Sequence, residues 1–469
     1  MARVRSTGTK RGFPIAFIAG VPIIIFAVLV AADCISPFPI DHRSPTIAAT
    51  SWLFVRGAPV YHELNAATRY VLPYGPMVYL INGALLRLTG PSLVAAKIGG
   101  CLAALLGILF SYLAFRKAAD LSKAVTLTGL LALYLAFFKI RSFWPGPDSF
   151  LFFCVSLGLW SAVLDRRILP GLLCGIVLGV SLNLKLHAFL YFIPVLTLLT
   201  VRKGLGPLLT SLVTSFLVAA LPFLLPNVSF SNMVAWYLQY SKHGIDVRLL
   251  AANPLFLAFL LAPAVLYAFY FICVDSSGFR SFLRADRLWL GSLAISAVSV
   301  SVVGTKVGAG PHHLIPLIPL ILFTAGRMKP LPDPDRSSYN RWIIAAVVIL
   351  AMPVIAKLAI EFGDFVRMNE RTLTAERATG RAVLADLQAI ERAEGEGVDC
   401  VGVRWRFDLR SDSLSPGLGF PGQSLSCGRS GSHGHAACRH EDSQADLVCP
   451  QIRKDQAVAH SERRCSIQS

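Results

Sequence analysis

The chain has 469 residues, of which 54% are hydrophobic and only 15% are charged, whereas soluble domains carry roughly 25% charged residues. This composition excludes an ordinary soluble protein. The formal net charge is +17, but Lys and Arg lie in short clusters between apolar runs, which is typical of a multispanning membrane protein and argues against nucleic acid as a partner.

A basic start precedes the first apolar run, Phe13 to Ala32. At about 20 residues the run has the length of a membrane span, and it exceeds the core of about 7–15 apolar residues in a secretory signal peptide. Although Val30-Ala31-Ala32 imitates a cleavage site, we interpret the run as an uncleaved anchor with a cytoplasmic N-terminus.

Further apolar runs along the chain predict more membrane-spanning helices. They lie at about 92–115, 121–139, 149–164, 168–184, 187–201, 205–226, 254–274, 288–305, 313–326 and 342–359. With the first run they predict an all-α integral membrane protein with about 11 transmembrane helices.

The distribution of basic residues predicts the orientation of these helices. With the N-terminus inside, the inner loops hold most Lys and Arg residues, including Arg166-Arg167 and Arg202-Lys203, as the positive-inside rule requires. The same alternation puts a set of titratable residues outside: Asp33, Asp41, His42, Asp148, Lys185, His187, Lys306, His312 and His313. Ionisable groups at membrane depth usually mark a site. We therefore expect a multi-pass inner-membrane protein with its site on the periplasmic face.

The first outer loop, at about 33–90, is large and is expected to be structured. Ser44-Pro45 has the residues of a helix start, with the hydroxyl as N-cap and proline in the first helical position. Gly57 and Pro59 are expected to end that helix.

The apolar stretch Met77 to Thr89 is too short for a span, at about 20 Å as a helix, and it contains Asn82 and Arg87. If it crossed the membrane, every later loop would change sides and the basic pairs would lie outside. We therefore interpret it as an interfacial or re-entrant helix at the outer surface.

Short motifs in the first half of the chain resemble a known superfamily. They are Asp41-His42 after the first span, Gly57-x-Pro59-x-Tyr61, Tyr74-Gly75-Pro76-Met77 before a helix ending at Gly90, and Pro147-Asp148. This arrangement resembles the GT-C glycosyltransferases, in particular the branch with protein O-mannosyltransferases and the 4-amino-4-deoxy-L-arabinose transferases of lipid A. The resemblance covers about residues 13–200, and the rest is similar only as further spans.

The resemblance implies transfer of a sugar from a polyprenyl-phosphate donor to an envelope acceptor (lipid, glycan or protein) on the outer face. The donor, the acceptor and membrane lipids are then the expected partners. The chain departs from the family at His42, where a second carboxylate is usual, at Gly75-Pro76-Met77, where a Pro-Pro-Leu-like turn is usual, and in lacking the lysine before that turn. These departures leave the donor sugar and the acceptor open. The alternative function is a multispanning transporter or a flippase of lipid-linked glycans, although the two halves usual in transporters are not apparent.

Two carboxylates are candidates for catalysis. Asp41 is the candidate general base that deprotonates the acceptor hydroxyl, with a loop turn as the alternative, and His42 would share the proton or orient Asp41. Asp148 either positions the acceptor or a divalent cation, or caps a helix. Asp33 is expected to mark the membrane boundary.

A departing lipid phosphate needs positive charge and hydrogen-bond donors. The candidate donor-phosphate ligands are Lys185, His187, Lys306, His312, His313 and Lys97. The glycines between residues 304 and 310 would let backbone amides approach a phosphate. Each lysine has the alternative of snorkelling to the interface, which is the preferred interpretation of Lys97.

Metal binding has no supporting pattern in the sequence. Adjacent histidines such as His312 and His313 point about 100° apart on a helix, so they do not form a chelating pair. The cofactor is unknown, and a divalent cation remains open.

The chain changes character after the membrane domain at 1–360. Residues 361–400 are expected to form an outer-facing helical segment. Residues 401–469 are rich in Ser, Gly and Cys and lack apolar periodicity. A disordered tail and a shifted reading frame from about residue 400 are both open.

Overall fold

The computed structural model describes residues 13–35, 43–66, 74–138 and 140–328, together with 352, 356, 437–438 and 447–448. The chain divides into two units, Met1–Glu396 and Gly397–Ser469. In the second unit, β1 (Ala437–Cys438) pairs antiparallel with β2 (Leu447–Val448). The expected helical segment at 361–400 lies outside the described residues, as does most of the expected tail at 401–469.

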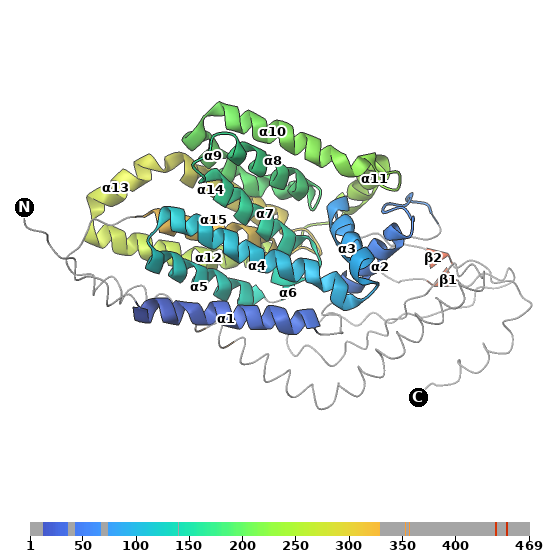
Figure 1. The fold of residues 1–469 in the computed structure, drawn as a ribbon, viewed down its shortest axis with the longest axis horizontal. Coiled ribbons are helices and arrows are strands. Elements are labelled where there is room, and N and C mark those ends of the chain that lie inside the picture. The colour runs from blue at the N-terminus through green and yellow to red at the C-terminus, as the bar shows by residue number, and fades with distance from the viewer. Residues whose placement is uncertain are drawn as a thin grey trace, which may run out of the picture. The chain divides into compact units, whose positions relative to one another are not determined.

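The described part of the first unit consists of helices joined by loops, as expected of an all-α protein (Figure 1). The elements are α1 (Phe13–Ile35), α2 (Arg43–Val55), α3 (Pro76–Thr89), α4 (Leu93–Ala118), α5 (Leu121–Phe138), α6 (Ile140–Phe143), α7 (Pro147–Ala162), α8 (Leu169–Leu182), η1 (Leu186–Ala188), α9 (Phe189–Lys203), α10 (Leu205–Ala220), η2 (Leu221–Leu224), α11 (Phe230–Ser241), α12 (Val247–Val274), α13 (Ser276–Ala285), α14 (Arg287–Val303), η3 (Pro311–Leu317) and α15 (Ile318–Arg327). Each apolar run expected as a span before residue 327 overlaps one or two of these elements. The run at 342–359 lies outside the described residues, apart from Met352 and Ala356.

Fewer of these helices have full membrane-spanning length than the sequence predicts. Within the described residues, 5 helices are long and apolar enough to cross a membrane, or 6 if α13 and α14, bent by 73°, count as one span. By contrast, α7 and α8 have 16 and 14 residues, about 24 and 21 Å at 1.5 Å per residue. Most of α7 is buried by other helices, so its apolar character reflects packing inside the protein.

The loops assigned to the inner side contact one another. Asp165, between α7 and α8, pairs with Lys117 at the end of α4 at 2.9 Å and with Arg202 at the end of α9 at 4.0 Å. The hydrogen bond and charge of Lys117 hold the pKa of the exposed Asp165 carboxyl below its usual range. Arg327, at the end of α15, pairs with Asp286 between α13 and α14. These contacts agree with the predicted grouping of loops.

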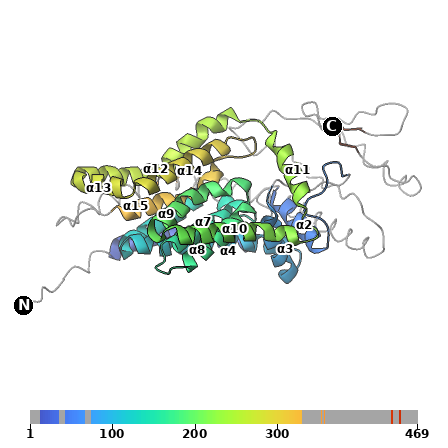
Figure 2. The ribbon, with the colours of Figure 1, turned by 90° about the horizontal axis from the view of Figure 1, so that it is seen from above.

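The loops assigned to the outer side also meet. The Val60 amide, after α2, donates to the Asn227 carbonyl before α11 at 2.9 Å, and the Asp246 amide donates to the Thr305 carbonyl at 2.8 Å. In both views α2, α3 and α11 lie at the opposite end of the unit from α13 (Figures 1 and 2). The helices therefore carry two separate sets of loops, one at each end.

A stripe of small residues joins α8 to α10. Gly171, Gly175 and Gly179 recur every fourth residue, so they share one face of α8. A Cβ added at Gly175 or Gly179 would come 2.6 Å from the carbonyl oxygen of Ser211 or Ser215, respectively. Such small-residue faces let helix backbones approach closely in membranes. This packing holds the C-terminal end of α8, where Lys185 follows.

The segment predicted as the first outer loop contains the two helices expected in it, α2 and α3. The described part of α2 begins at Arg43, so Ser44 lies inside its first turn and not before it as expected. The predicted interfacial helix is α3, in which Asn82 is fully buried and donates to the Pro145 carbonyl at 2.9 Å. Three further helices, α6, α11 and α13, were not predicted.

Candidate functional site

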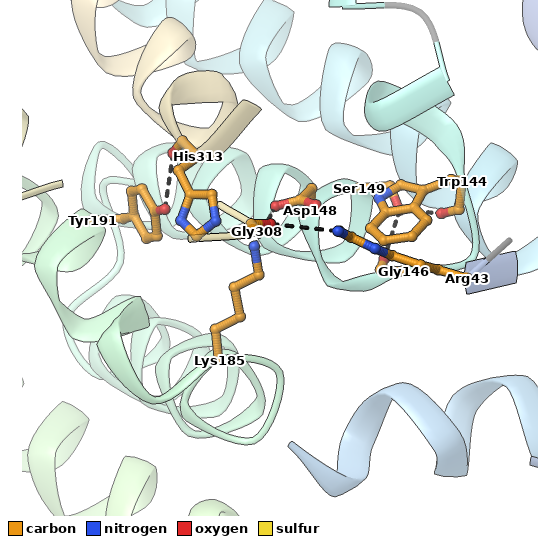
Figure 3. Close-up of polar contacts among 9 residues, drawn as sticks. All are labelled: Arg43, Trp144, Gly146, Asp148, Ser149, Lys185, Tyr191, Gly308 and His313. Carbon is orange, nitrogen blue, oxygen red and sulfur yellow. Dashed lines mark hydrogen bonds and ion pairs between the residues drawn. The ribbon is translucent and has the colours of Figure 1, made fainter. Parts of the chain in front are cut away.

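The candidate site is centred on a buried ion pair between two of the predicted residues. The Lys185 ammonium lies 2.6 Å from Oδ1 of Asp148, and the two residues are 7% and 1% exposed. Figure 3 shows the Lys185 side chain extending from its turn toward Asp148, with the His313 ring beside them. Asp148 and Lys185 come from the start of α7 and the turn after α8, so tertiary packing brings them together.

Asp148 is held by the rigid segment that precedes α7. The Ser149 hydroxyl donates to the Trp144 carbonyl at 2.7 Å, and a Cβ at Gly146 would come 2.3 Å from the Trp144 ring. The N-cap of α7 is Gly146, without a side-chain cap bond. The alternative of Asp148 as a helix N-cap is therefore wrong. Its Oδ2 atom is buried without a hydrogen-bond partner among the described residues.

The turn that carries Lys185 is fixed by the first outer loop. The Gly75 amide donates to the Leu184 carbonyl at 3.1 Å, and the Met77 amide donates to the Asn183 carbonyl at 3.0 Å. A Cβ at Gly75 would lie 2.1 Å from the backbone carbonyl oxygen of Asn183. Only glycine therefore lets the two backbone segments come this close. Lys185 is buried and paired with Asp148, so its side chain does not reach toward the membrane interface. The alternative of a snorkelling lysine is therefore wrong for Lys185.

Three predicted histidines form one cluster beside the ion pair. The rings of His187 and His313 stack with their centroids 5.2 Å apart, and the rings of His312 and His313 are 4.9 Å apart. The Tyr191 hydroxyl, one helical turn after His187, donates to the His313 carbonyl at 2.8 Å. Nε2 of His187 and Nδ1 of His313 are buried and have no hydrogen-bond partner within the described ranges.

Positive charge surrounds this histidine cluster. Burial, with the charges of Lys185, Arg141 and Arg43, holds the pKa of His312 well below its usual range. Its ring is therefore neutral at pH 7 and has one donor and one acceptor nitrogen. The Arg141 guanidinium lies 4.4 Å from the centre of the Trp144 ring and acts electrostatically on Asp148. A site with this charge favours an anionic ligand.

The glycine-containing loop at 304–310 lies next to the first outer loop. Arg43, at the start of α2, donates to the Gly308 carbonyl at 3.4 Å. Lys306 is exposed, and its charge acts on His187. The amides of Lys306, Val307 and Ala309 already donate to protein carbonyls. The loop therefore offers fewer backbone amides to a phosphate than the glycine pattern predicts.

Lys97 is also buried, in a different pair. Its ammonium lies 3.3 Å from Oδ1 of Asp33 and donates to the Asp33 carbonyl at 3.2 Å. At 2% exposure, Lys97 does not snorkel as expected, and Asp33 does more than mark a membrane boundary. The packing of α1 against α4 brings the two residues together.

Asp41 and His42 lie outside the described residues, so their predicted roles remain predictions. They directly precede Arg43 in the chain, and Arg43 contacts the loop that contains Lys306. Within the parts of the chain that the structure describes, no group of three His, Cys, Asp or Glu residues is arranged to hold a metal ion.

The sequence analysis missed four residues of the site: Arg43, Arg141, Trp144 and Tyr191. Arg141 and Trp144 precede the Pro147-Asp148 motif by a few residues, so their closeness to this motif was a signal for their place in the site. Tyr191 follows His187 by four residues, and that spacing puts both on one helix face. Arg43 directly follows the Asp41-His42 motif in the chain.

No family model and no curated protein matches this chain. Among solved structures, ArnT from Cupriavidus metallidurans bound to undecaprenyl phosphate is similar, with a TM-score of 0.47 and 16% identity over 72% of this chain and 64% of that chain. Its apo state has a TM-score of 0.47 and 18% identity, over 72% and 66% of the two chains. The Archaeoglobus fulgidus oligosaccharyltransferase tethered with an acceptor peptide has a TM-score of 0.38 and 12% identity, over 72% and 55%. This chain thus spans 64% to 66% of the two ArnT chains.

Proposed function

We propose that this protein transfers a sugar from a polyprenyl-phosphate carrier to an envelope acceptor on the outer side of the membrane. The observation that carries the proposal is the cationic cluster around the Asp148–Lys185 pair. It draws on four separate segments: the start of α7, the turn after α8, η3 and the loop that Arg43 contacts. Such convergence of buried ionisable groups is costly in a membrane protein unless it serves a site.

In this proposal the phosphate of the lipid donor binds near Lys185. An ammonium has three N–H donors, and Lys185 gives one to Asp148, so donors remain for a phosphate oxygen. Lys306 would add positive charge as the lipid phosphate leaves, and the His312 and His313 rings would add hydrogen-bond donors. Charge stabilisation of the leaving group in a site that excludes water is a large catalytic effect.

Asp41 is the proposed general base, with His42 orienting it. Arg43 ties the residues that follow Asp41 to the Gly308 loop, which supports a position for the first outer loop next to the phosphate ligands. Asp148 is proposed to position Lys185 through their ion pair, and hence to assist catalysis without contacting the acceptor.

The proposed orientation puts the Asp148 end of the helices outside. The basic loops at the opposite end, which contain Lys117, Arg202 and Arg327, would then face the cytoplasm, as the positive-inside rule favours. We retain about 11 spans, with α7 and α8 crossing inside the helical bundle and the run at 342–359 as the last span.

The test is an assay of the purified protein in detergent with a polyprenyl-phosphate-linked sugar pool and an envelope extract. Sugar transfer predicts release of polyprenyl phosphate in step with labelling of an acceptor. A flippase would instead move the lipid-linked sugar across a vesicle membrane and leave the sugar–phosphate bond intact. Transport of the lipid-linked sugar into vesicles without cleavage of the sugar–phosphate bond would therefore show that the protein is a flippase and not a glycosyltransferase.

A further inference from the structure

A group of four residues joins α1 to α4 outside the site described above. The Lys97 ammonium lies 3.3 Å from Oδ1 of Asp33. One helical turn further along α4, Sγ of Cys101 lies 3.7 Å from the Val30 carbonyl oxygen. Because the contacts move back along α1 as they move forward along α4, the two helices pack antiparallel.

Cys34 lies beside Cys101 in this interface. An α-helical amide donates to the carbonyl four residues earlier, so the Val30 carbonyl that Cys101 contacts is the acceptor for the Cys34 amide. Side chains in α-helices lean toward the N-terminus. In an antiparallel pair, Cys34 therefore leans toward the level of Cys101, and Cys101 leans toward the level of Cys34.

Both residues are free thiols in the structure. The Cys34 side chain acts on the Cys101 thiol across the interface, in agreement with their shared contact at Val30. The other described cysteines are Cys154, Cys174 and Cys273, and for these no contact with another thiol is found within the described residues. Cys34 is half-buried, whereas Cys101 is 4% exposed, so Cys34 is the thiol that an external reagent reaches first.

We propose that Cys34 and Cys101 form a disulfide that staples α1 to α4 at the outer end of the helices. The proposal rests on the outward orientation given under Proposed function, because disulfides persist in oxidising compartments outside the cytoplasm. It adds a covalent modification that the glycosyltransferase proposal does not require.

The oxidant is a dithiol–disulfide oxidoreductase or a low-molecular-weight disulfide of the outer compartment. The Cys34 thiolate attacks one sulfur of the oxidant disulfide, and the other oxidant sulfur leaves as a thiolate. The Cys101 thiolate then attacks Cys34 in the mixed disulfide and releases the second oxidant thiol. Two protein thiols and one oxidant disulfide thus become one protein disulfide and two oxidant thiols.

This staple would act on two parts of the site. Asp41 is the seventh residue after Cys34, so fixing the end of α1 restricts where the following segment starts. Sγ of Cys101 also lies 3.8 Å from the Phe143 carbonyl, in the loop that leads to Asp148. A covalent bond here would hold α1, α4 and that loop in one arrangement.

The test is peptide mapping. Intact cells are denatured in the presence of N-ethylmaleimide, which alkylates every free thiol as the protein unfolds, and the protein is then digested with trypsin. Trypsin cleaves after Arg11, Arg43, Lys97 and Arg116, so Cys34 and Cys101 lie in separate peptides. We expect a linked pair of these peptides that separates on reduction, with Cys154 alkylated as a matched buried free thiol. Alkylation of both Cys34 and Cys101 without reduction, or a link from either to another cysteine, would overturn the proposal.

Variants distinguish a specific bond from chance oxidation. Cys34→Ser should leave Cys101 alkylated, Cys101→Ser should leave Cys34 alkylated, and Cys154→Ser should keep the linked peptides. Sugar transfer is measured on the same wild-type preparation. A missing crosslink in an active enzyme therefore contradicts only the disulfide, whereas a crosslink in an inactive protein contradicts only the proposed function.

Discussion

Asp148 and Lys185 form an ion pair with 2.6 Å between Oδ1 and Nζ, and both side chains are almost fully buried. Removing one partner of a buried pair leaves an uncompensated charge, which costs roughly 3–5 kcal/mol of stability. Replacing both partners by apolar residues of similar volume is often neutral or stabilising. The contributions of this pair to stability and to function can therefore be measured separately.

The first prediction concerns that separation. Asp148→Leu should lower the thermal unfolding temperature, because Lys185 loses its partner. The double variant Asp148→Leu with Lys185→Met should recover much of the stability but not the sugar transfer. Unfolding in detergent and sugar transfer by the same preparations check this. An active double variant would show that the pair is only structural.

The second prediction tests Asp41 as the general base. Asp41→Asn preserves size but removes the basic carboxylate, so turnover should fall by about 100-fold or more. Protein yield should stay near that of the wild type. Asp165→Asn, in the loop at the opposite end, is the matched control and should keep full turnover. Normal turnover by purified Asp41→Asn enzyme would end the assignment.

The third prediction separates phosphate binding from snorkelling at Lys306. Losing a charge-assisted hydrogen bond costs roughly 1.5–3 kcal/mol, so Lys306→Gln should weaken donor use by about 10-fold or more. If both lysines face one phosphate, combining this change with Lys185→Gln should be less than additive. Donor titrations measure the effect, with Lys117→Gln as the control. If the Lys306→Gln enzyme depended on donor concentration as the wild type does, Lys306 would only reach toward the membrane interface and would not bind the phosphate.

The fourth prediction concerns the close approach of Gly75 to Asn183. Gly75→Ala places a Cβ 2.1 Å from the Asn183 oxygen, so the turn before Lys185 must move and sugar transfer should fall by about 10-fold or more. Gly206→Ala is the control, because a Cβ there meets no atom within 4 Å. Equal activity of the two variants would contradict the role of this turn in positioning Lys185.

The fifth prediction concerns topology. Reporter fusions after Lys117 and Arg167 should report the cytoplasm, and a fusion after Asp364 should report the outside. The physical reason is the excess of Lys and Arg in the loops joined by Asp165. A cytoplasmic signal after Asp364 would contradict the last span at 342–359.

The positions of the helices and the grouping of their loops were predictable from the sequence. Apolar length predicts a helix wherever water cannot satisfy the backbone, and the basic clusters predict which loops share a side. Accordingly α4 and α5 lie close to their expected ranges, whereas α12 begins at Val247, before its expected start at 254. Among the described residues, the ion pairs of Asp165 join it to loops from its own predicted side. Amphipathic helices such as α13 give weaker signals and were missed.

Only the tertiary structure decided which polar residues meet. The sequence put Lys97 and Lys185 near helix ends, where a lysine usually reaches for water. Packing of α1 against α4 instead buries Lys97 with Asp33, and packing of α7 against α8 buries Lys185 with Asp148. Apolar length and charge are local properties of the chain, whereas the rotation of each helix against its neighbours depends on side chains distant in sequence. The sequence predicts where each of these four residues lies along its own helix. The rotation of the helices decides that Lys97 pairs with Asp33 and Lys185 with Asp148.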